Sequence, residues 1–359
     1  MSKYLNTIKV DNVIIGDDFP TYFIADIAAN HDGSIDRAIK LIKLAKECGA
    51  NAVKFQHFDA KTIVSDYGFK NLGCKASHQE KWKKSVYEVY EDASIPSKWT
   101  EILKDACDDN KITFFTSPYS IELVDGVDDY VSAYKVGSGD ITWIDIIKHM
   151  ASKKKPIFIA TGASNFGDVC NAMDAAMDKN KDVVLMQCNT NYTAKKENFK
   201  YINLNVLKSY RNMYPGVILG LSDHTLGCTT VLGAVALGAR VIEKHFTDDR
   251  YNNGPDHAFS MDPNSWRDMV DKVRELESAL GSGVKKVEDN ESETVILQRR
   301  SIRVMQDLKA GSIINKKDIE VLRPCPKQAV SPNYIDQVIG SEIVSDVKKG
   351  ECLYWKNLK

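Results

Sequence analysis

The sequence has no long apolar run, no paired cysteine motif and no excess of either charge. Its 48 Lys and Arg balance 49 Asp and Glu, so the net charge is −1, which argues against a nucleic-acid or anionic-membrane partner. No stretch approaches the roughly 20 apolar residues of a membrane span, and the N-terminal residues lack the apolar core of a signal peptide. The eight cysteines occur singly, without CxxC, which argues against a disulfide framework or zinc ribbon. We therefore expect a globular cytoplasmic protein.

The sequence does contain a regular alternation of short β-branched segments and amphipathic stretches, from Thr21 to about Leu280. The first amphipathic stretch has helical apolar spacing, and Gly49 stands where that helix should end. Strands that alternate with helices favour a (β/α)8 TIM barrel, and no GxGxxG supports a doubly wound sheet. The eight predicted strands are Tyr22–Ala28, Asn51–Gln56, Ile112–Thr116, Ser132–Val136, Pro156–Ala160, Val183–Gln187, Val217–Leu221 and Arg240–Lys244.

The pattern changes after the predicted barrel domain, residues 1–282. Residues 283–296 are rich in Gly, Ser and charge, which predicts a linker. Residues 297–359 are strand-like and helix-poor, and two D-x-K-x-G segments begin at Asp307 and Asp346. This repeat predicts a small β-rich domain with pseudo-twofold structure. Because about sixty residues bury a modest core, we expect this domain to dock onto a barrel, its own or a neighbour's.

Polar residues gather at the carboxyl ends of the predicted strands, the face where TIM barrels carry out chemistry. One such residue would normally be a solvated loop residue, but together they favour an active site. They are Asp26, Asn30, His31, Lys54, Gln56, Thr116, Ser117, Lys135, Ser138, Asp140, Gln187, Asn189, Ser222, Asp223, His224, Glu243 and His245.

Lys54 and Lys135 lie within apolar strand sequence. A buried ammonium is costly unless it meets an anion, although either lysine alone could extend its charge to the barrel rim. Two of them favour an anionic substrate such as a phosphate or carboxylate. The glycines on either side of Ser138 could expose backbone N–H groups to phosphate oxygens.

His224 and His245 end the last two predicted strands, which are adjacent in a barrel. Their imidazoles could bind one metal ion and leave positions open for water and substrate. Two hydrogen-bonded structural histidines are the alternative. Asp223 and Glu243 could orient these histidines, and Asp256 follows in a loop that could reach the mouth of the site.

Several motifs, in this order along nearly the whole chain, resemble the sialic acid synthase family, the N-acetylneuraminate synthase-like enzymes. In the tail, Arg323-Pro324 and residues 331–340 look like the family's antifreeze-like (SAF) domain. The barrel motifs are Ile24-ADIAANHDG, Ala52-VKFQ, Tyr134-KVGSGD, Leu221-SDHT, Glu243-KHFT and Gly254-PDHAFSMDP.

The resemblance implies a metal-dependent condensation of phosphoenolpyruvate (PEP) with an N-acyl hexosamine, giving a nine-carbon nonulosonic acid and phosphate. His224 and His245 would hold the divalent metal, typically Mn²⁺, with Mg²⁺ or Co²⁺ as alternatives. Arg323 would contact the sugar in the partner's barrel, which implies a domain-swapped homodimer. The implied catalytic residues are Asp26, Lys54, Lys135, Asp140, His224 and His245. The implied PEP-binding residues are Lys54, Ser117, Lys135, Ser138, Thr190 and Ser222, and the sugar-binding residues are Gln56, Asp140, Tyr192, Asp256 and Arg323.

The chain departs from the family pattern at several positions. Asp26 replaces the usual glutamate, Cys325 the usual glycine and Thr193 a frequent proline. The segment Asp66–Glu91 is long and distinctive, and we predict that it forms a loop on the substrate side. These departures leave the sugar open: N-acetylmannosamine, a 6-deoxy-diacetamido hexose, or a related sugar of a bacterial surface polysaccharide.

Two functions of other kinds compete with this one. Lys54 or Lys135 could form a Schiff base with pyruvate, making a metal-independent aldolase that acts on an amino sugar. Alternatively, the tail could be a carbohydrate- or ice-binding module on an inert barrel. That alternative leaves the buried lysines and paired histidines without a role.

Overall fold

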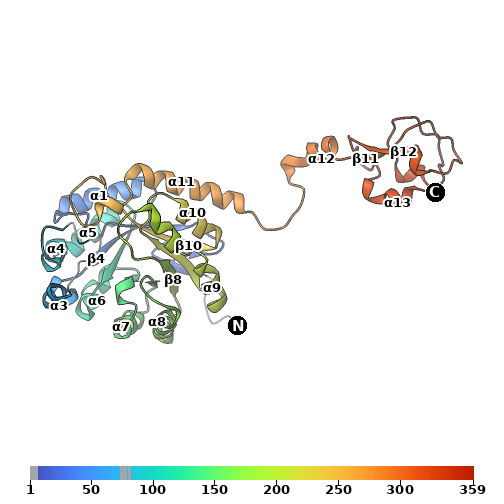
Figure 1. Ribbon diagram of the computed structural model, residues 1–359. Coiled ribbons are helices and arrows are strands. Elements are labelled where there is room, and N and C mark those ends of the chain that lie inside the picture. Colours follow the sequence, from blue (N-terminus) through green and yellow to red (C-terminus); the bar gives the residue numbers. More distant parts are fainter. Residues whose placement is uncertain (1–6, 73–78, 80–81) are drawn as a thin grey trace. The chain divides into compact units, whose positions relative to one another are not determined.

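Eight parallel strands close into a barrel in the computed structural model, which describes residues 7–72, 79 and 82–359 (Figure 1). Around the barrel the order is β10-β3-β4-β5-β6-β7-β8-β9. The strands are β3 (Tyr22–Asp26), β4 (Ala52–His57), β5 (Thr113–Pro118), β6 (Tyr134–Val136), β7 (Ile157–Ala160), β8 (Val183–Cys188), β9 (Ile218–Asp223) and β10 (Ala239–His245). The surrounding helices are α1 (Ile35–Glu47), α5 (Trp99–Asp109), α6 (Ile121–Val127), α7 (Ile144–Ser152), α8 (Phe166–Lys179), α9 (Val206–Met213), α10 (Thr229–Ala236) and α11 (Pro263–Leu280). The predicted (β/α)8 architecture is therefore confirmed.

The first barrel helix shows how the sequence sets its ends. The Ser34 hydroxyl accepts a hydrogen bond from the Arg37 backbone N–H at 3.3 Å, which satisfies one of the free donors at the start of α1. Gly49 follows the helix with a φ of +93°, a conformation that favours glycine. The predicted helix end is therefore confirmed.

Side chains along the barrel strands alternate between two environments, because successive residues of a strand point to opposite faces. Near the amino ends, one set fills the barrel interior; the other set packs under the helices in a larger core. The interior set includes Tyr22, Ile24, Ala52, Phe115, Phe158, Val184 and Val241. The same alternation, continued toward the carboxyl ends, gives Asp26, Lys54, Gln56, Ser117, Lys135, Ser222, Glu243 and His245. The polar groups are thus the upper layers of the barrel interior.

Strand boundaries differ from the predicted ones mainly at the carboxyl ends. Strand β3 ends at Asp26, and the chain turns at Ala28, whose φ is +45°. Strands β5, β9 and β10 run one or two residues further than predicted. Ser117, Ser222 and His245 consequently belong to strands rather than loops, and strand pairing fixes their direction.

An antiparallel hairpin precedes the barrel and was not predicted. It consists of β1 (Thr7–Val10) and β2 (Val13–Gly16). Its buried side chains Ile8, Val10 and Ile15 belong to the same apolar cluster as the barrel interior. Because that cluster lies at the amino ends of the strands, the hairpin covers the end of the barrel opposite the polar layers.

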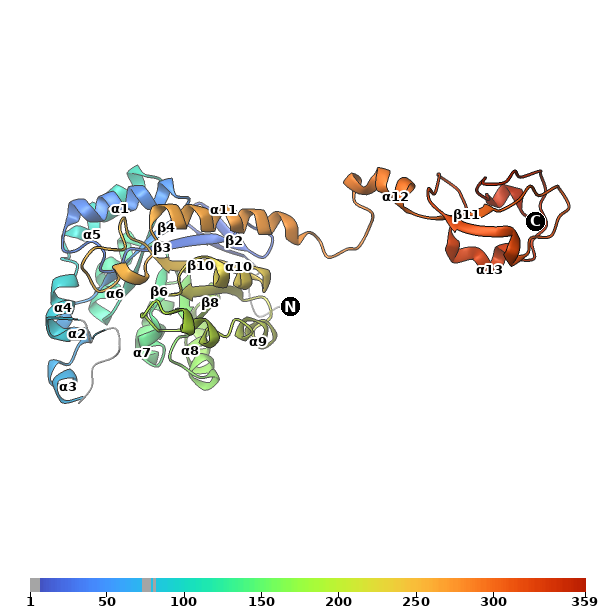
Figure 2. The same ribbon diagram turned by 45° about the horizontal axis from the view of Figure 1, so that its top comes forward.

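The connection between β4 and α5 carries three extra helices, α2 (Ala60–Ile63), α3 (Asp66–Asn71) and α4 (Val86–Ala93). They lie together at one side of the barrel (Figure 2). Helix α4 starts with a capping box, in which the side chains of Ser85 and Glu88 each bond the other's backbone N–H. The segment Asp66–Glu91 was predicted to be a loop, but its described part is mainly helical; residues 73–78 and 80–81 lie outside the described residues.

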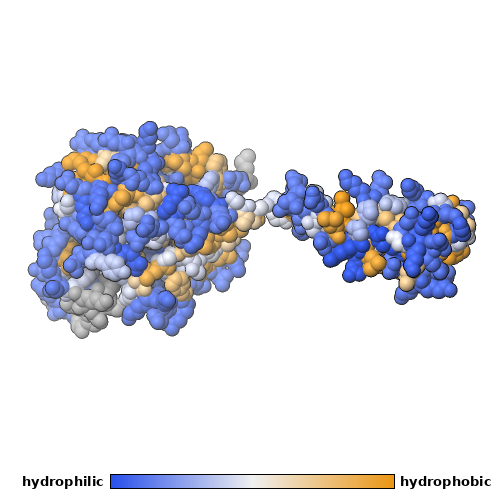
Figure 3. All heavy atoms as spheres, turned by 90° about the horizontal axis from the view of Figure 1, so that it is seen from above, coloured by the Kyte–Doolittle hydropathy of each residue, from blue (hydrophilic) through white to orange (hydrophobic). Residues whose placement is uncertain are grey.

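The chain divides into two compact units, Met1–Gly281 and Ser282–Lys359. The second unit contains α12 (Ser292–Gln298), α13 (Ile335–Val338) and an antiparallel sheet of β11 (Ser301–Val304) and β12 (Ile319–Leu322). Part of the segment expected to act as a linker is thus helical. In the part of the chain that the structure describes, no helix is long and apolar enough to cross a membrane. The visible surface of each unit is mostly hydrophilic, with scattered apolar side chains (Figure 3).

The two D-x-K-x-G segments pair with each other in the second unit. The Asp346 carboxylate accepts a hydrogen bond from the Ala310 N–H at 3.0 Å, and the Asp307 carboxylate accepts one from the Lys349 N–H at 2.8 Å. Ala310 and Lys349 hold equivalent positions in the repeat, so the contacts are reciprocal. The predicted pseudo-twofold structure is confirmed for this pair of turns.

Candidate active site

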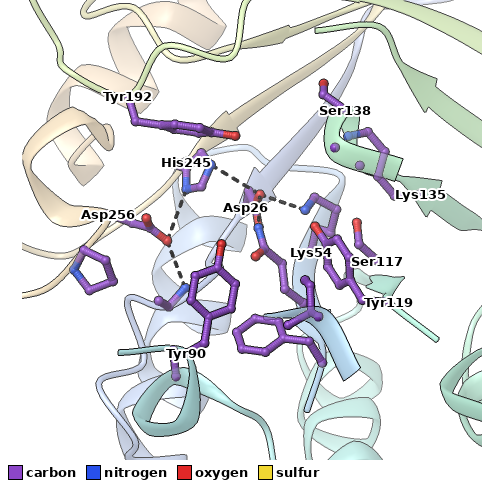
Figure 4. Close-up of a pocket in the computed structure, with 18 of the residues that line it drawn as sticks. Asp26, Lys54, Tyr90, Ser117, Tyr119, Lys135, Ser138, Tyr192, His245 and Asp256 are labelled. Atoms are coloured by element: carbon purple, nitrogen blue, oxygen red, sulfur yellow. Dashed lines mark hydrogen bonds and ion pairs between the residues drawn. The ribbon is translucent and has the colours of Figure 1, made fainter. Parts of the chain in front are cut away.

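A pocket of about 370 Å³ opens at the carboxyl ends of the barrel strands. This volume lies within the usual range of small-molecule sites. Figure 4 shows Asp26, Lys54 and His245 near its centre. The lining residues are Asp26, Ala29, Lys54, Gln56, Phe58, Ile63, Trp82, Val89, Tyr90, Ala93, Ser117, Tyr119, Lys135, Gly137, Ser138, Gly139, Asp140, Tyr192, Ser222, His224, Glu243, His245, Pro255 and Asp256.

Four buried charges form the floor of the pocket. The ammonium of Lys54 lies 2.7 Å from Asp26 Oδ2 and 3.9 Å from Glu243 Oε1. The ammonium of Lys135 lies 3.0 Å from the same Glu243 oxygen. Strand register explains the first pair, because Lys54 on β4 stands directly beside Asp26 on β3. Glu243, on β10, is therefore the carboxylate that both lysines share.

The electrostatics of the floor keep Lys54 charged. Burial alone would favour the neutral amine, but the carboxylates of Asp26 and Glu243 reverse that effect and raise the pKa of Lys54. Two polar atoms on the floor, the Ser117 hydroxyl and Glu243 Oε2, find no hydrogen-bond partner among the described residues. Unsatisfied buried polar atoms are rare in folded proteins. They indicate that a polar ligand completes this floor.

The two histidines lie side by side, with ring centroids 5.4 Å apart. His224 Nδ1 donates to the Asn189 carbonyl at 2.9 Å, so the lone pair lies on Nε2 whenever the ring is neutral. His245 Nδ1 is buried, and no residue that the structure describes forms a hydrogen bond with it. Burial, followed by the charges of His224 and Lys54, holds the pKa of His245 well below 6.5. For His224, burial opposes the charged ring, but the hydrogen bond with Cys188 raises the pKa on balance.

This donor set fits a divalent metal. A neutral imidazole with an unpartnered nitrogen is a ready ligand, and a second imidazole lies beside it. Within the described ranges, no three His, Cys, Asp or Glu side chains form a complete cluster of metal ligands. Two protein ligands would leave the remaining positions to water and substrate, as in a catalytic site.

Within the described part of the chain, no hydrogen bond joins Asp223 or Glu243 to either histidine, which corrects the prediction that these carboxylates orient the rings. Asp223 accepts from Lys244 at 2.5 Å and from the Thr230 hydroxyl at 2.7 Å. Glu243 is bound to the lysines of the floor. The Asn189 backbone carbonyl orients His224 instead. Asp223 points away from the pocket because it follows Ser222, whose side chain points inward, on the same strand.

Three further predicted residues line the rim. The Tyr192 ring stacks edge-on to His224, with centroids 4.4 Å apart. Asp256 Oδ2 accepts from the Ala29 N–H at 3.2 Å and lies 3.9 Å from His245 Nδ1. Burial raises the pKa of Asp256 to about 6, and burial likewise raises the pKa of Asp140 to about 6. Both carboxyls can therefore exchange protons near neutral pH.

The predicted phosphate loop lies against the chain that follows β7. Ser138 starts the short 3-10 helix Ser138–Asp140, whose first N–H groups lack helical partners. Its hydroxyl accepts from the Gly162 N–H at 3.0 Å. A Cβ at position 162 would come within 2.7 Å of Thr190 and 2.9 Å of Ser138, so only glycine allows this close approach. Thr190 therefore lies beside the loop, although it is not among the residues that line the pocket.

The remaining predicted residues have different surroundings. Gln56 lines the pocket and donates to Asp26 Oδ2 at 3.3 Å. Ser222 donates to Glu243 Oε1 at 3.2 Å. Arg323 lies in the second unit, at the end of β12, where its exposed side chain donates to the Gln298 carbonyl at 2.6 Å.

Several strand-end residues serve the fold instead of the pocket. The Asn30 amide donates to the Phe246 carbonyl and the Ser260 hydroxyl, both at 2.9 Å, which joins two loops. Thr116 bonds the His57 ring at 2.7 Å. His31, Gln187 and Asn189 do not line the pocket either, although the Asn189 carbonyl orients His224. Thr116 and Gln187 point toward the helices, because successive residues of a strand face opposite sides. This alternation is the sequence signal that distinguishes them from the pocket residues.

The segment Asp66–Glu91 was predicted to lie on the substrate side, and Trp82, Val89 and Tyr90 from it do line one side of the pocket; no single residue of this side was predicted. Apolar and aromatic residues from the connection after β4 and from the end of β5 line it: Phe58, Ile63, Trp82, Val89, Tyr90, Ala93 and Tyr119. The unusual length of this connection was the signal for the segment, but length does not identify individual pocket residues. Its apolar residues follow no single period, because they come from short helices and loops.

A closed (β/α)8 barrel whose open end gathers buried lysines, carboxylates and histidines in one pocket defines a TIM-barrel enzyme. A model of the NeuB family matches residues 41–285, and a model of the SAF domain matches residues 299–359. The chain therefore belongs to the NeuB family and carries an SAF domain. This confirms the family and the tail domain that the sequence motifs indicate.

Similar proteins support this assignment along the whole chain. The N,N'-diacetyllegionaminic acid synthase of Legionella pneumophila is 33% identical over 350 residues, which cover 96% of each chain. A pseudaminic acid synthase of Campylobacter jejuni is 31% identical over 338 residues, covering 94% of this chain and 96% of that one. The crystal structure of the spore coat polysaccharide biosynthesis protein SpsE of Bacillus subtilis matches with a TM-score of 0.65 and 27% identity. The match covers 98% of this chain and 99% of that one.

Proposed function

We propose that the protein is a nonulosonic acid synthase, which condenses PEP with an N-acyl hexosamine to give a nine-carbon 2-keto acid and inorganic phosphate. The observation that carries the proposal is the pair of buried lysines, Lys54 and Lys135, which meet at Glu243 on the pocket floor. Such a floor suits a small polyanion. The names of the relatives, which are synthases of legionaminic and pseudaminic acid, support the product class.

PEP would lie on the floor. Its phosphate and carboxylate would take the two ammonium groups as counter-ions, in place of part of the Glu243 contact. The unpartnered Ser117 hydroxyl would donate to one of these oxygens. Ser138 with its loop, Ser222 and Thr190 would complete the PEP site from the neighbouring strands. These donors stabilise the phosphate as it becomes a leaving group.

The acceptor sugar would occupy the mouth, above PEP. Gln56, Asp140, Tyr192 and Asp256 would face it. A divalent ion, for which we propose Mn²⁺ ahead of Mg²⁺ or Co²⁺, would be held by His224 and His245 and would supply a Lewis acid for the sugar's aldehyde oxygen.

The bond changes follow from these positions. C3 of PEP bonds to the aldehyde carbon, whose oxygen becomes a hydroxyl and gains a proton. Water adds to C2, the C2–O bond to phosphate breaks, and the water oxygen becomes the keto oxygen. Of the two water protons, one replaces the proton gained by the new hydroxyl and the other leaves with the phosphate. Asp256, whose pKa is raised to about 6 by burial, is placed near His245 to give the proton to the new hydroxyl. Asp26 holds the Lys54 ammonium in an ion pair: despite the short side chain, Asp26 Oδ2 lies 2.7 Å from Lys54 Nζ.

The Schiff-base alternative is less well supported by the same contacts. An amine must be neutral to attack a ketone, but the carboxylates around Lys54 raise its pKa. Both lysines are also engaged in ion pairs. We further propose that the protein acts in the cytoplasm as a domain-swapped homodimer, in which Arg323 contacts the sugar bound to the partner subunit.

The test is phosphate release from PEP with Mn²⁺ across a panel of N-acyl hexosamines, with and without EDTA. The proposal expects release that needs both the metal and a matching sugar, together with a nonulosonic acid detected by mass spectrometry. Borohydride trapping of the enzyme with pyruvate covers the alternative. A trapped lysine adduct, or the absence of both phosphate release and PEP binding, would overturn the proposal.

A further inference from the structure

Each of the two pocket histidines follows a charged residue that faces the helices. Asp223 precedes His224, and Lys244 precedes His245. Strand register places Lys244 on β10 directly beside Asp223 on β9. The two residues form an ion pair at 2.5 Å, and the side chain of each is only 1% exposed. A buried ion pair outside the pocket therefore joins the two strands that lead to the histidines.

Lys244 holds the chain on both sides of His224. Its ammonium donates to the carboxylate of Asp223, the residue before the histidine. It also donates to the carbonyl of Thr225, the residue after the histidine, at 2.6 Å. The Asp223 carboxylate in turn accepts from the Thr225 N–H at 3.2 Å and from the Thr225 hydroxyl at 2.9 Å. We call Asp223, Thr225 and Lys244 the clamp, and His224 lies in the turn that the clamp closes.

Strand pairing ends just before His224. Strand β9 stops at Asp223, and Lys244–Asp223 is the last register pair between β9 and β10. His245 differs, because it still belongs to β10 and pairs with Asp26 on β3. The clamp therefore supports the main chain at the point where the strand no longer fixes its direction.

A buried ion pair is a costly way to stabilise two strands. Desolvation offsets much of the attraction between the charges, and well-packed apolar residues often stabilise a fold equally well. What charged hydrogen-bonding groups add is a defined geometry. Because the contacts of the clamp converge on the main chain around His224, geometry explains this pair better than stability does.

We propose that Lys244 is a positioning residue for the divalent metal. Through the clamp, it fixes His224 beside His245 so that both imidazoles can bind one ion. The clamp acts on the main chain, whereas the Asn189 carbonyl orients the His224 ring. This inference rests on the proposed function, which supplies the metal, and adds to it a residue that does not line the pocket.

Removing both charges tests the clamp without leaving one buried charge unpaired. The double variant Asp223→Asn/Lys244→Met keeps similar side-chain sizes and takes away the ion pair. In calorimetry, we expect its dissociation constant for Mn²⁺ to be at least about tenfold above that of the wild type. Residues that support metal ligands typically contribute about 10- to 100-fold to affinity. The dissociation constant for PEP without metal should change less than twofold, because Lys54 and Lys135 keep their contacts on the floor.

Two hydroxyl groups provide a milder variant and its matched control. The Thr230 hydroxyl on α10 donates to Asp223 of the clamp at 2.7 Å. The Tyr134 hydroxyl on β6 donates to Asp128, outside the clamp, at the same distance. Thr230→Val should weaken Mn²⁺ binding at least threefold, and Tyr134→Phe should leave it unchanged. Thermal unfolding checks that each variant is folded at the temperature of the titration.

The outcomes separate positioning from a purely structural role. An Mn²⁺ affinity within twofold of the wild type in the folded double variant would overturn the proposal. If the double variant does not fold, an unchanged affinity in Thr230→Val has the same meaning. Equal losses in Thr230→Val and Tyr134→Phe, or equal weakening of Mn²⁺ and PEP binding in the double variant, would also overturn it, because they indicate a general loosening of the barrel.

The wild type distinguishes this inference from the proposed function. Wild-type protein that binds Mn²⁺ and PEP, with variants that bind both equally well, would overturn the clamp alone. Wild-type protein that binds PEP but not Mn²⁺ would overturn the metal site and the clamp together. Protein that binds neither would overturn the synthase proposal itself.

Discussion

Replacing Glu243 by glutamine tests whether this carboxylate holds the pocket floor together. The change keeps the size of the side chain and removes the charge shared by Lys135 at 3.0 Å and Lys54 at 3.9 Å. At an effective dielectric constant of about 20, these distances correspond to attractions of about 5.5 and 4 kcal/mol. Part of this is offset, because the variant no longer takes a carboxylate charge out of water.

Removing one partner of a buried ion pair costs about 3–5 kcal/mol. We therefore expect Glu243→Gln to lose about that much stability at pH 7, or roughly 6–10 °C in Tm, at about 2 °C per kcal/mol. Inorganic phosphate should recover part of the loss, because it supplies the missing anion to the two lysines.

Urea and thermal unfolding of the barrel, with and without phosphate, measure this effect. The matched control is Glu47→Gln, which also breaks a lysine pair at 3.9 Å, but on the exposed surface of α1. That exposed pair should contribute less than about 0.5 kcal/mol. A loss in Glu243→Gln no larger than in the control would refute the electrostatic account of the floor.

Three other predictions concern the rim and the metal ligands. Gly254→Ala would place a Cβ 2.6 Å from the His257 ring, so the loop carrying Asp256 should shift and the KM for the sugar should rise at least tenfold; an unchanged KM would contradict this. Burial raises the pKa of Asp140 from 3.8 to about 6, so its contribution to stability is present below about pH 4 and is lost as the pH rises to about 6. The urea midpoint of Asp140→Asn should therefore not show the decline between about pH 4 and pH 6 that Asp140 causes in the wild type. Equal declines in the urea midpoints of the two proteins over this pH range would contradict the prediction. His224→Ala should abolish high-affinity Mn²⁺ binding in calorimetry, while retained binding would remove His224 from the metal site.

The sequence was sufficient to predict the barrel, because eight strand-like segments alternate with amphipathic stretches that end at glycines such as Gly49. It also located the floor lysines, since charged residues inside apolar strands are conspicuous. The partners of those lysines could not be predicted. Lys135 and Glu243 are 108 residues apart, and only barrel closure and strand register bring them together.

Residues near strand ends were the second difficulty. A period of two separates Ser222, which faces the pocket, from Asp223, which faces the helices. That period helps only where the strand's end is known, and β9 runs two residues beyond its predicted end. Apolar pocket residues such as Phe58 and Tyr90 could not be named for another reason: they lie in short helices and loops, whose positions depend on tertiary packing.

The β1–β2 hairpin has a kinetic consequence. It covers the amino end of a barrel whose interior is already filled by side chains such as Tyr22 and Phe115, so both substrates would enter and both products leave by one mouth. With PEP on the floor and the sugar above it, a sugar that arrives first blocks the path of PEP. Steady-state kinetics should then show compulsory order, with PEP binding first and excess sugar acting as a dead-end inhibitor competitive with PEP. Phosphate, released at the floor, would leave after the nine-carbon product.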